Sequence, residues 1–256
     1  MQAAVRFAVA CLAVLILPVL CGCAKPQIQV VAKTLEKSGL EMLFVPAGEF
    51  TMGSDVEERE KPIRKVTLDA YWIGKYPVTV AQFRQFTTEA KYKYDWGATK
   101  PKWGWQDTHP MVNVNWEDAR AYCQWAGGDL PTEAQWEKAA RGTDGRQYPW
   151  GGKWEDGRTC SGGTSTCPVG TYPQSASPYG AMDMSGNVCE WCLDWYQSSY
   201  EGLETRNPTG AKSGKIKVLR GGGWPDTPEF QRTTHRGSYN PTVRFDFHGF
   251  RLATKA

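Results

Sequence analysis

Glycine and proline interrupt this chain at short intervals, and tryptophans recur between the interruptions. The 256 residues include 27 Gly, 16 Pro and 12 Trp. Glycine and proline are the strongest local breakers of helices and strands, whereas each indole ring buries a large apolar surface. The sequence therefore predicts short regular elements, joined by long turns and anchored by aromatic rings. It shows neither long alternating strands nor repeats of about 20 to 50 residues, which excludes sandwiches, propellers and solenoids.

Short helices begin where capping residues precede helix-forming stretches. Three residues have side chains suited to the N-cap, namely Thr79, Asn115 and Thr132. Gln82 and Gln135 lie three residues after the two threonines, which completes the pattern of a capping box. We expect helices over residues 80–86, 116–126 and 133–141, the last two ended by Gly127 and Gly142. The strand candidates are residues 44–46, 65–69 and 249–253.

The bulk composition fits a single folded domain. A hydrophobic content of 41% and a charged content of 22% allow a sizeable core, and residues 41–256 have the length of one domain. The net charge is only +3, and the basic residues form no run beyond Arg64-Lys65 and residues 212–217. We therefore expect no nucleic-acid partner.

Residues 1–22 have the features of a lipoprotein signal peptide. Arg6 precedes an apolar run over residues 7–20, whose length suits a signal peptide better than a membrane span. The sequence Leu-Cys-Gly-Cys at residues 20–23 matches a bacterial lipobox with Cys23 as the lipidated residue. Several acyl chains on one residue anchor a protein stably, and residues 23–40 would form a polar tether. We predict a lipid-anchored protein of the bacterial cell envelope, facing the periplasm or the surface and favouring the outer membrane; soluble release after an ordinary secretory signal is the alternative.

Five cysteines remain after the signal peptide and the lipidation residue, namely Cys123, Cys160, Cys167, Cys189 and Cys192. In an oxidising envelope this odd number allows two disulfides and one free thiol. We pair Cys160 with Cys167, because the Gly162-Gly163 loop between them can close. Cys189 and Cys192 have the C-x-x-C redox spacing without its usual βαβ context, and a bridge from Cys123 to Cys192 is a further alternative.

A series of sequence motifs runs along nearly all of the mature chain. It begins with Met-Leu-Phe-Val-Pro-Ala-Gly-Glu-Phe-Thr-Met-Gly-Ser at residues 42–54. It continues at residues 73–79, 110–114, 130–142, 148–151, 186–191 and 248–251. In content and order these motifs resemble the formylglycine-generating enzyme (sulfatase-modifying factor) domain family. The resemblance implies an irregular α+β fold, rich in loops and related to C-type lectins, over residues 41–256.

Residues 218–236 resemble the family's catalytic segment without its cysteines. In the family, an Arg-Gly-Gly-Ser-aromatic run leads into two cysteines separated by four residues, which bind copper and activate oxygen to oxidise a substrate cysteine. Here Arg-Gly-Gly-Gly-Trp at residues 220–224 is followed by Asp226 and Gln231 at those two positions. Copper(I) requires soft ligands. We therefore expect no copper and no catalytic residue in this segment.

Residues 185–190 resemble the family's calcium loop. The resemblance implies four ligands, namely the carbonyl oxygens of Ser185, Gly186 and Val188 and the carboxylate of Glu190. Calcium prefers such oxygen ligands on flexible turns, so we expect calcium as a cofactor. The alternative is a tight turn in which Glu190 accepts backbone hydrogen bonds. We expect no second calcium site at residues 159–161, because Cys160 replaces the amide residue of the family.

The resemblance also implies a cleft around the 218–236 segment. Its candidate binding residues are Trp224, Asp226, Glu229, Gln231, Arg232, His235 and Arg236. We expect most other tryptophans in the core, and the three histidines have no spacing typical of metal ligands. Cys189 and Cys192 lie beside the predicted calcium loop and not in the 218–236 segment, which argues against a displaced copper pair. A carboxylate such as Asp226 or Glu229 could serve as acid or base in a cofactor-free oxidation.

Loss of both cysteines removes the metal site and the redox group together, and function depends on the site and not on the fold. We therefore predict a non-catalytic scaffold that binds a protein or glycan partner in the envelope. The alternative is an oxidase of the formylglycine-generating type that acts on residues of secreted proteins. A carbohydrate-binding lipoprotein is a third possibility, suggested by the kinship with lectins.

Overall fold

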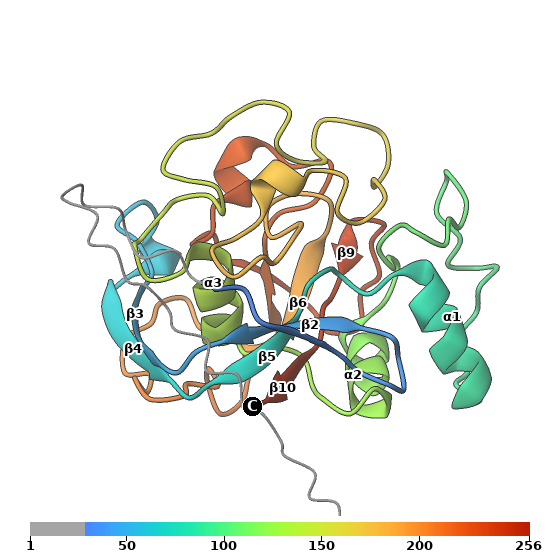
Figure 1. Cartoon of the computed structure of the whole chain (residues 1–256), viewed down its shortest axis with the longest axis horizontal. Helices are drawn as coiled ribbons and strands as arrows, with labels where there is room; N and C mark the ends of the chain where they lie inside the picture. Colours follow the sequence, from blue (N-terminus) through green and yellow to red (C-terminus); the bar gives the residue numbers. More distant parts are fainter. Residues whose placement is uncertain (1–28) are drawn as a thin grey trace, which may run out of the picture.

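The computed structural model describes residues 29–256. The predicted signal peptide and the lipidation residue Cys23 lie outside the described residues. Within them, no helix is both long and apolar enough to cross a membrane. The described part is an α+β domain with short elements and long loops (Figure 1), which confirms the predicted fold class.

The two ends of the described chain meet in one antiparallel sheet. Its strand order is β1 (Ala32–Thr34), β2 (Glu41–Val45), β5 (Tyr71–Gly74) and β10 (Ala253–Lys255). Residues 32–40 are therefore part of the domain, and their assignment to a tether is wrong. The reason is that β1 pairs with β2 and Leu40 is buried in the core.

A second four-stranded sheet carries the segment of functional interest. Its order is β8 (Gly237–Tyr239), β7 (Lys217–Arg220), β6 (Cys189–Trp195) and β9 (His248–Gly249). Only β9 runs parallel to its neighbour, β6. A separate hairpin joins β3 (Gly48–Met52) and β4 (Arg64–Leu68). The predicted strand over residues 249–253 is thus wrong, because the chain leaves β9 at Gly249 and joins the other sheet at Ala253.

Three α-helices are described, namely α1 (Val80–Glu89), α2 (Trp116–Trp125) and α3 (Glu133–Arg141). Each has a complete capping box at its start, which confirms the starts predicted from sequence. In α2 the reciprocal partner of Asn115 is Asp118. Three short 3-10 helices lie in the loops, namely η1 (Glu58–Glu60), η2 (Pro173–Ser175) and η3 (Pro228–Gln231).

Two clusters of buried apolar side chains form the core, one around α1 and α2 and the other around α3. Trp116, Trp136 and Trp191 are buried, as predicted. The side chains of Trp125, Trp150 and Trp195 are only partly buried, so fewer of these rings belong to the core than the sequence predicts.

Buried ion pairs attach the 218–236 segment to α3. Arg220, at the end of β7, lies 2.6 Å from Glu137 and 3.0 Å from Glu133. Arg236 lies 2.7 Å from Glu133. All four side chains are at most 3% exposed. The chain between the two arginines is therefore held at both ends over one helix.

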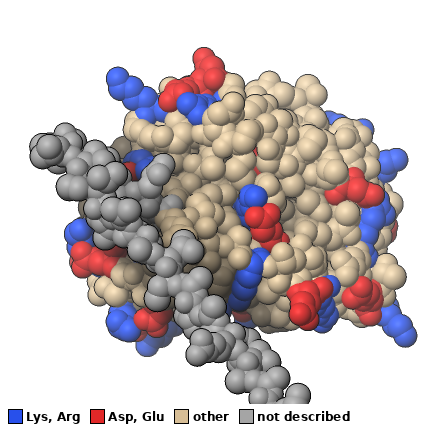
Figure 2. Space-filling model, viewed as in Figure 1, with Lys and Arg blue, Asp and Glu red and all other residues tan. Residues whose placement is uncertain are grey.

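On the face shown in Figure 2, acidic and basic side chains are scattered and form no patch of one sign.

Candidate functional site

The cleft segment, residues 218–236, contains glycines at which other parts of the chain approach the backbone closely. Gly222 has a φ of +67°, and a Cβ there would lie 2.8 Å from Gln231 Cγ. A Cβ at Gly223 would lie 2.9 Å from Phe247 Cβ. Glycine therefore lets the chain turn back onto η3 and lets Phe247 pack against it. The family has a hydroxyl residue where this chain has Gly223, and the contact with Phe247 explains the smaller residue.

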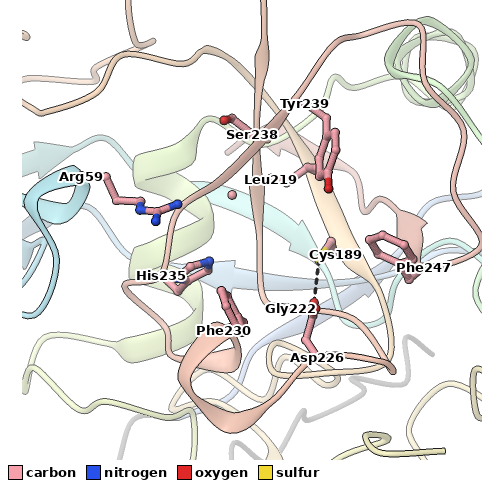
Figure 3. Close-up of a pocket in the computed structure, with 11 residues that line it drawn as sticks. Arg59, Cys189, Leu219, Gly222, Asp226, Phe230, His235, Ser238, Tyr239 and Phe247 are labelled. Atoms are coloured by element: carbon pink, nitrogen blue, oxygen red, sulfur yellow. Dashed lines mark hydrogen bonds between the residues drawn. The ribbon is translucent and has the colours of Figure 1, made fainter.

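Beyond these glycines the segment lines a cavity of about 300 Å³, here called the Asp226 pocket. It is lined by Arg59, Cys189, Leu219, Gly222, Asp226, Phe230, His235, Gly237, Ser238, Tyr239 and Phe247. Figure 3 shows Phe230 and Phe247 on opposite sides of Asp226, with Arg59 and His235 together on one flank. Residues from η1, β6, β7, η3 and β8 thus meet in one pocket.

Of the seven predicted cleft residues, only Asp226 and His235 line the pocket. The others have positions or partners outside it. Gln231 is 0% exposed, and its side-chain amide donates to the carbonyl of Asp226 and accepts from the hydroxyl of Thr159. Glu229 bonds to Thr227 in an exposed turn, and the Trp224 ring packs edge-to-face on Trp103.

Arg232 and Arg236 are structural residues, because carboxylates and backbone carbonyls occupy their guanidinium groups. Arg232 donates to both oxygens of Glu60 and to Glu57. Arg236 donates to both oxygens of Glu133. Neither guanidinium is free to bind a ligand.

The pocket contains a free thiol that the sequence places elsewhere. Cys189 Sγ lies 3.6 Å from Asp226 Oδ2, so this thiol lines the pocket although Cys189 is not part of the 218–236 segment. Burial and the neighbouring carboxylate of Asp226 raise the pKa of this thiol well above its usual value, which keeps it protonated. Cys192, three residues along β6, is buried and faces the other side of the strand.

The disulfide between Cys160 and Cys167 is confirmed, with the Cα atoms 5.9 Å apart. Cys123, Cys189 and Cys192 are free, so neither the Cys189–Cys192 nor the Cys123–Cys192 bridge forms. The closed loop contacts the cleft segment, because Gly162 N donates to Trp224 O. The amide of Asn187 also bonds to both backbone groups of Cys167. The loop therefore braces one side of the pocket.

The Arg59 and His235 flank of the pocket carries little net charge. Arg59 forms an ion pair of 2.7 Å with Glu57, and His235 Nδ1 lies 3.3 Å from the same carboxylate. Burial lowers the pKa of His235 despite this contact, so the ring is neutral near pH 7. Glu57, Glu60 and His235 come within 4.8 Å of one another, as metal ligands do. However, Arg232 already pairs with both glutamates.

The predicted calcium ligand Glu190 forms a buried ion pair with Arg251. Both of its oxygens accept hydrogen bonds from Arg251 at 2.6 Å, and Trp136 Nε1 donates to one of them at 2.8 Å. The side chains of Glu190 and Arg251 are 0% exposed. A cation on Glu190 would have to displace this buried guanidinium. The calcium site at Ser185, Gly186, Val188 and Glu190 stays a prediction, and its one carboxylate is paired with Arg251 in this structure.

His248 forms part of the support behind the pocket wall. It is 0% exposed, and neither ring nitrogen has a hydrogen-bond partner among the described residues. Four aromatic rings surround it, with ring centroids between 4.7 and 5.1 Å away, namely Trp191, Tyr239, Phe245 and Phe247. Burial lowers the pKa of His248 to about 3. A neutral imidazole therefore packs between the core and two rings that line the pocket.

With this geometry established, the match to known proteins identifies the class. Residues 28–256 match the family described as sulfatase-modifying factor enzyme 1-like domain, and the chain belongs to that family. The solved structure of PvdO from Pseudomonas aeruginosa is similar, with a TM-score of 0.79 and 26% identity, over 91% of this chain and 100% of that one.

Three relatives are similar to most of this chain. The formylglycine-generating enzyme of Mus musculus is 31% identical over 83% of this chain and 74% of its own length. The Bos taurus protein named inactive C-alpha-formylglycine-generating enzyme 2 is 30% identical over 85% of this chain and 89% of its own. The serine/threonine-protein kinase Pkn1 of Chlamydia trachomatis is 34% identical over 83% of this chain, and the match spans only 38% of that protein.

The Glu190–Arg251 pair predicts a large loss of stability without any dependence on calcium. Glu190→Gln would leave the buried Arg251 without its charged partner, which costs about 3 to 5 kcal/mol. Chemical unfolding of the described domain, in calcium and in a chelator, measures this loss. Glu49→Gln, at an exposed ion pair with Lys65, is the control and should change little. If calcium stabilised the parent protein but not the Glu190→Gln variant, the result would contradict this expectation and support a calcium site at Glu190.

His248 predicts sensitivity to acid. Its pKa is about 3 in the folded state and about 6.5 in an unfolded chain, so the unfolded state takes up the proton first. The stability that this neutral ring contributes is present above pH 6.5 and is lost as the pH falls towards 3. Between pH 6.5 and 5, we expect the parent to lose about 2 kcal/mol more than His248→Phe. Unfolding at several pH values measures the difference, and parallel curves would contradict it.

Proposed function

We propose that this chain is a lipid-anchored protein of the bacterial envelope, whose sulfatase-modifying factor domain binds a partner at the Asp226 pocket without oxidising it. The partner would be a protein or glycan of the envelope. The proposal combines the lipobox at residues 20–23 with the chemistry of the pocket, and each part has its own test.

Asp226 and Gln231 occupy the positions of the two cysteines of the family, and this replacement supports the proposal that the domain does not catalyse oxidation. Asp226 offers a hard carboxylate oxygen, which accepts from the backbone N–H of Gly223 at 2.8 Å. Gln231 is buried, with its amide bonded on both sides. A copper(I) site needs soft sulfur ligands. Cys189 supplies one neutral thiol, and Cys192 faces the opposite side of β6.

The relatives include a protein named as a formylglycine-generating enzyme and one named as inactive. One relative is named an inactive C-alpha-formylglycine-generating enzyme, which fits a role in binding alone. The alternative is an oxidase that modifies residues of secreted proteins. The observation that favours it is the carboxylate of Asp226 beside the thiol of Cys189, because a carboxylate can act as a base. The raised pKa of that thiol argues against its use as a thiolate.

An oxidation assay distinguishes binding from catalysis. The mature domain is incubated with copper, oxygen and a peptide that carries the sulfatase cysteine motif, and the peptide is analysed by mass spectrometry. We expect the cysteine to remain unoxidised, because no pair of thiolates is available at Asp226 and Gln231. An active formylglycine-generating enzyme serves as the positive control. Conversion of the peptide by this chain at a comparable rate would reject the non-catalytic proposal.

The anchor is tested on the full chain in a bacterial host. Labelling with a radioactive fatty acid should depend on Cys23, because the lipobox places the acyl chains on this residue. Cys23→Ser should lose the label and move from the membrane to the soluble fraction. Cys21→Ser, two residues earlier, is the matched control and should keep the label. Equal labelling of Cys23→Ser and the parent would show that Cys23 is not the anchor.

A further inference from the structure

The Asp226 pocket has the size for one side chain. Its volume of about 300 Å³ lies at the lower limit for pockets that hold whole small molecules. An amino-acid side chain that enters from a longer polymer needs no more space. The pocket therefore fits the tip of a partner better than a large free ligand.

Exposed aromatic rings lie at the pocket and beside it. Phe230 is 45% exposed, Tyr239 43% and Phe245 36%. Tyr239 and Phe245 contact each other with ring centroids 5.2 Å apart, and Phe245 stacks on Phe247 at 5.2 Å. Aromatic groups gathered on a protein surface mark sites of interaction with other proteins. Here they frame a pocket that a partner can enter.

The charge within the pocket is negative. Asp226 is the only carboxylate among the lining residues. Its Oδ2 accepts from Gly223 N and Cys189 Sγ, and no donor among the described residues is bonded to Oδ1. Arg59 is neutralised by Glu57, and burial keeps His235 uncharged. Among the lining residues, Asp226 is therefore the charged group without an ion-pair partner in the described part of the chain.

We propose that the Asp226 pocket receives the cationic side chain, lysine or arginine, of a polypeptide partner. This step rests on the proposed binding function and names the chemistry of its ligand. The methylene stem would pack along Leu219 and the aromatic walls, as long basic side chains do on apolar surfaces. The charged head would reach the free oxygen of Asp226. Phe230 and Phe247 lie on either side of Asp226, and Tyr239 lies across the pocket from it (Figure 3); aromatic faces attract cations.

An anionic side chain would meet the carboxylate of Asp226 without a free cation to compensate. Arg59 is held by Glu57 and also donates to the carbonyl of Arg236, so releasing it would break an existing ion pair. A neutral apolar side chain would fill the cavity but leave Asp226 Oδ1 without a partner, and burying an unpaired charge is costly. Of these three kinds of side chain, only a cationic one can both pack against the aromatic rings and form an ion pair with Asp226.

Binding of short peptides tests this ligand class. The probes are otherwise identical glycine-rich peptides with a central lysine, arginine, acetyl-lysine or glutamate, titrated into the mature domain and followed by NMR or calorimetry. We expect the lysine and arginine peptides to bind at least about tenfold more tightly than the acetyl-lysine and glutamate peptides, since charge-assisted bonds are the strong ones. Raising the salt concentration should weaken their binding.

A matched pair of variants assigns the effect to the pocket. Asp226→Asn keeps the size of the side chain and should weaken the lysine peptide about tenfold, while leaving the acetyl-lysine peptide unchanged. Asp156→Asn removes the same charge from an exposed residue outside the pocket and should bind like the parent. Should Asp226→Asn fail to fold, the comparison of lysine with acetyl-lysine on the parent still decides.

The outcomes separate the two proposals. Equal binding of lysine and acetyl-lysine peptides, or full binding by Asp226→Asn, would overturn the cationic ligand and leave a binding role in place. Binding of an envelope oligosaccharide with no binding of any peptide would likewise overturn the polypeptide ligand alone. If neither peptides nor oligosaccharides bind, the proposed binding function fails as well.

Discussion

The structure depends on a buried ion-pair network that joins α3 to the segment around the pocket. Glu133 and Glu137 on one helix face Arg220 and Arg236, which mark the two ends of that segment. Arg220 also donates to the carbonyl groups of Thr233 and Thr234. Removing one partner from such a network would leave a buried charge uncompensated. The irregular chain between the arginines therefore keeps one conformation with little regular secondary structure.

The two arginines of the cleft segment that pair with glutamates do not line the pocket. Arg232 and Arg236 belong to the cleft segment in sequence, yet their guanidinium groups point to Glu60 and Glu133. What remains for a ligand is one carboxylate, one neutral thiol and a ring of aromatic side chains. This combination offers one protonated thiol in place of a pair of thiolates, which supports the proposed recognition of a charged group. A fold of this kind does not by itself fix the chemistry of its site.

Local features of the sequence predicted local features of the fold. Thr79 and Thr132 cap helices because the capping box involves residues three apart, and Cys160 reaches Cys167 across a short loop. Contacts between residues distant in sequence are not visible in such local patterns. The loop pattern around Glu190 contains no sign of Arg251, which lies 61 residues away in the sequence and pairs with it. Cys189 reaches Asp226 only because β6 pairs with β7, which leads directly into the cleft segment.

Residue types at fixed spacings are enough to recognise the family, the α+β class, the helix starts and the replacement of both cysteines by Asp226 and Gln231. Which charged side chains are paired cannot be read from such spacings. Arg232, Arg236 and Glu190 are held by partners from other elements, whereas Asp226 Oδ1 has no hydrogen-bond donor among the described residues. Whether a charge is paired depends on its neighbours in space, and these neighbours come together only on folding.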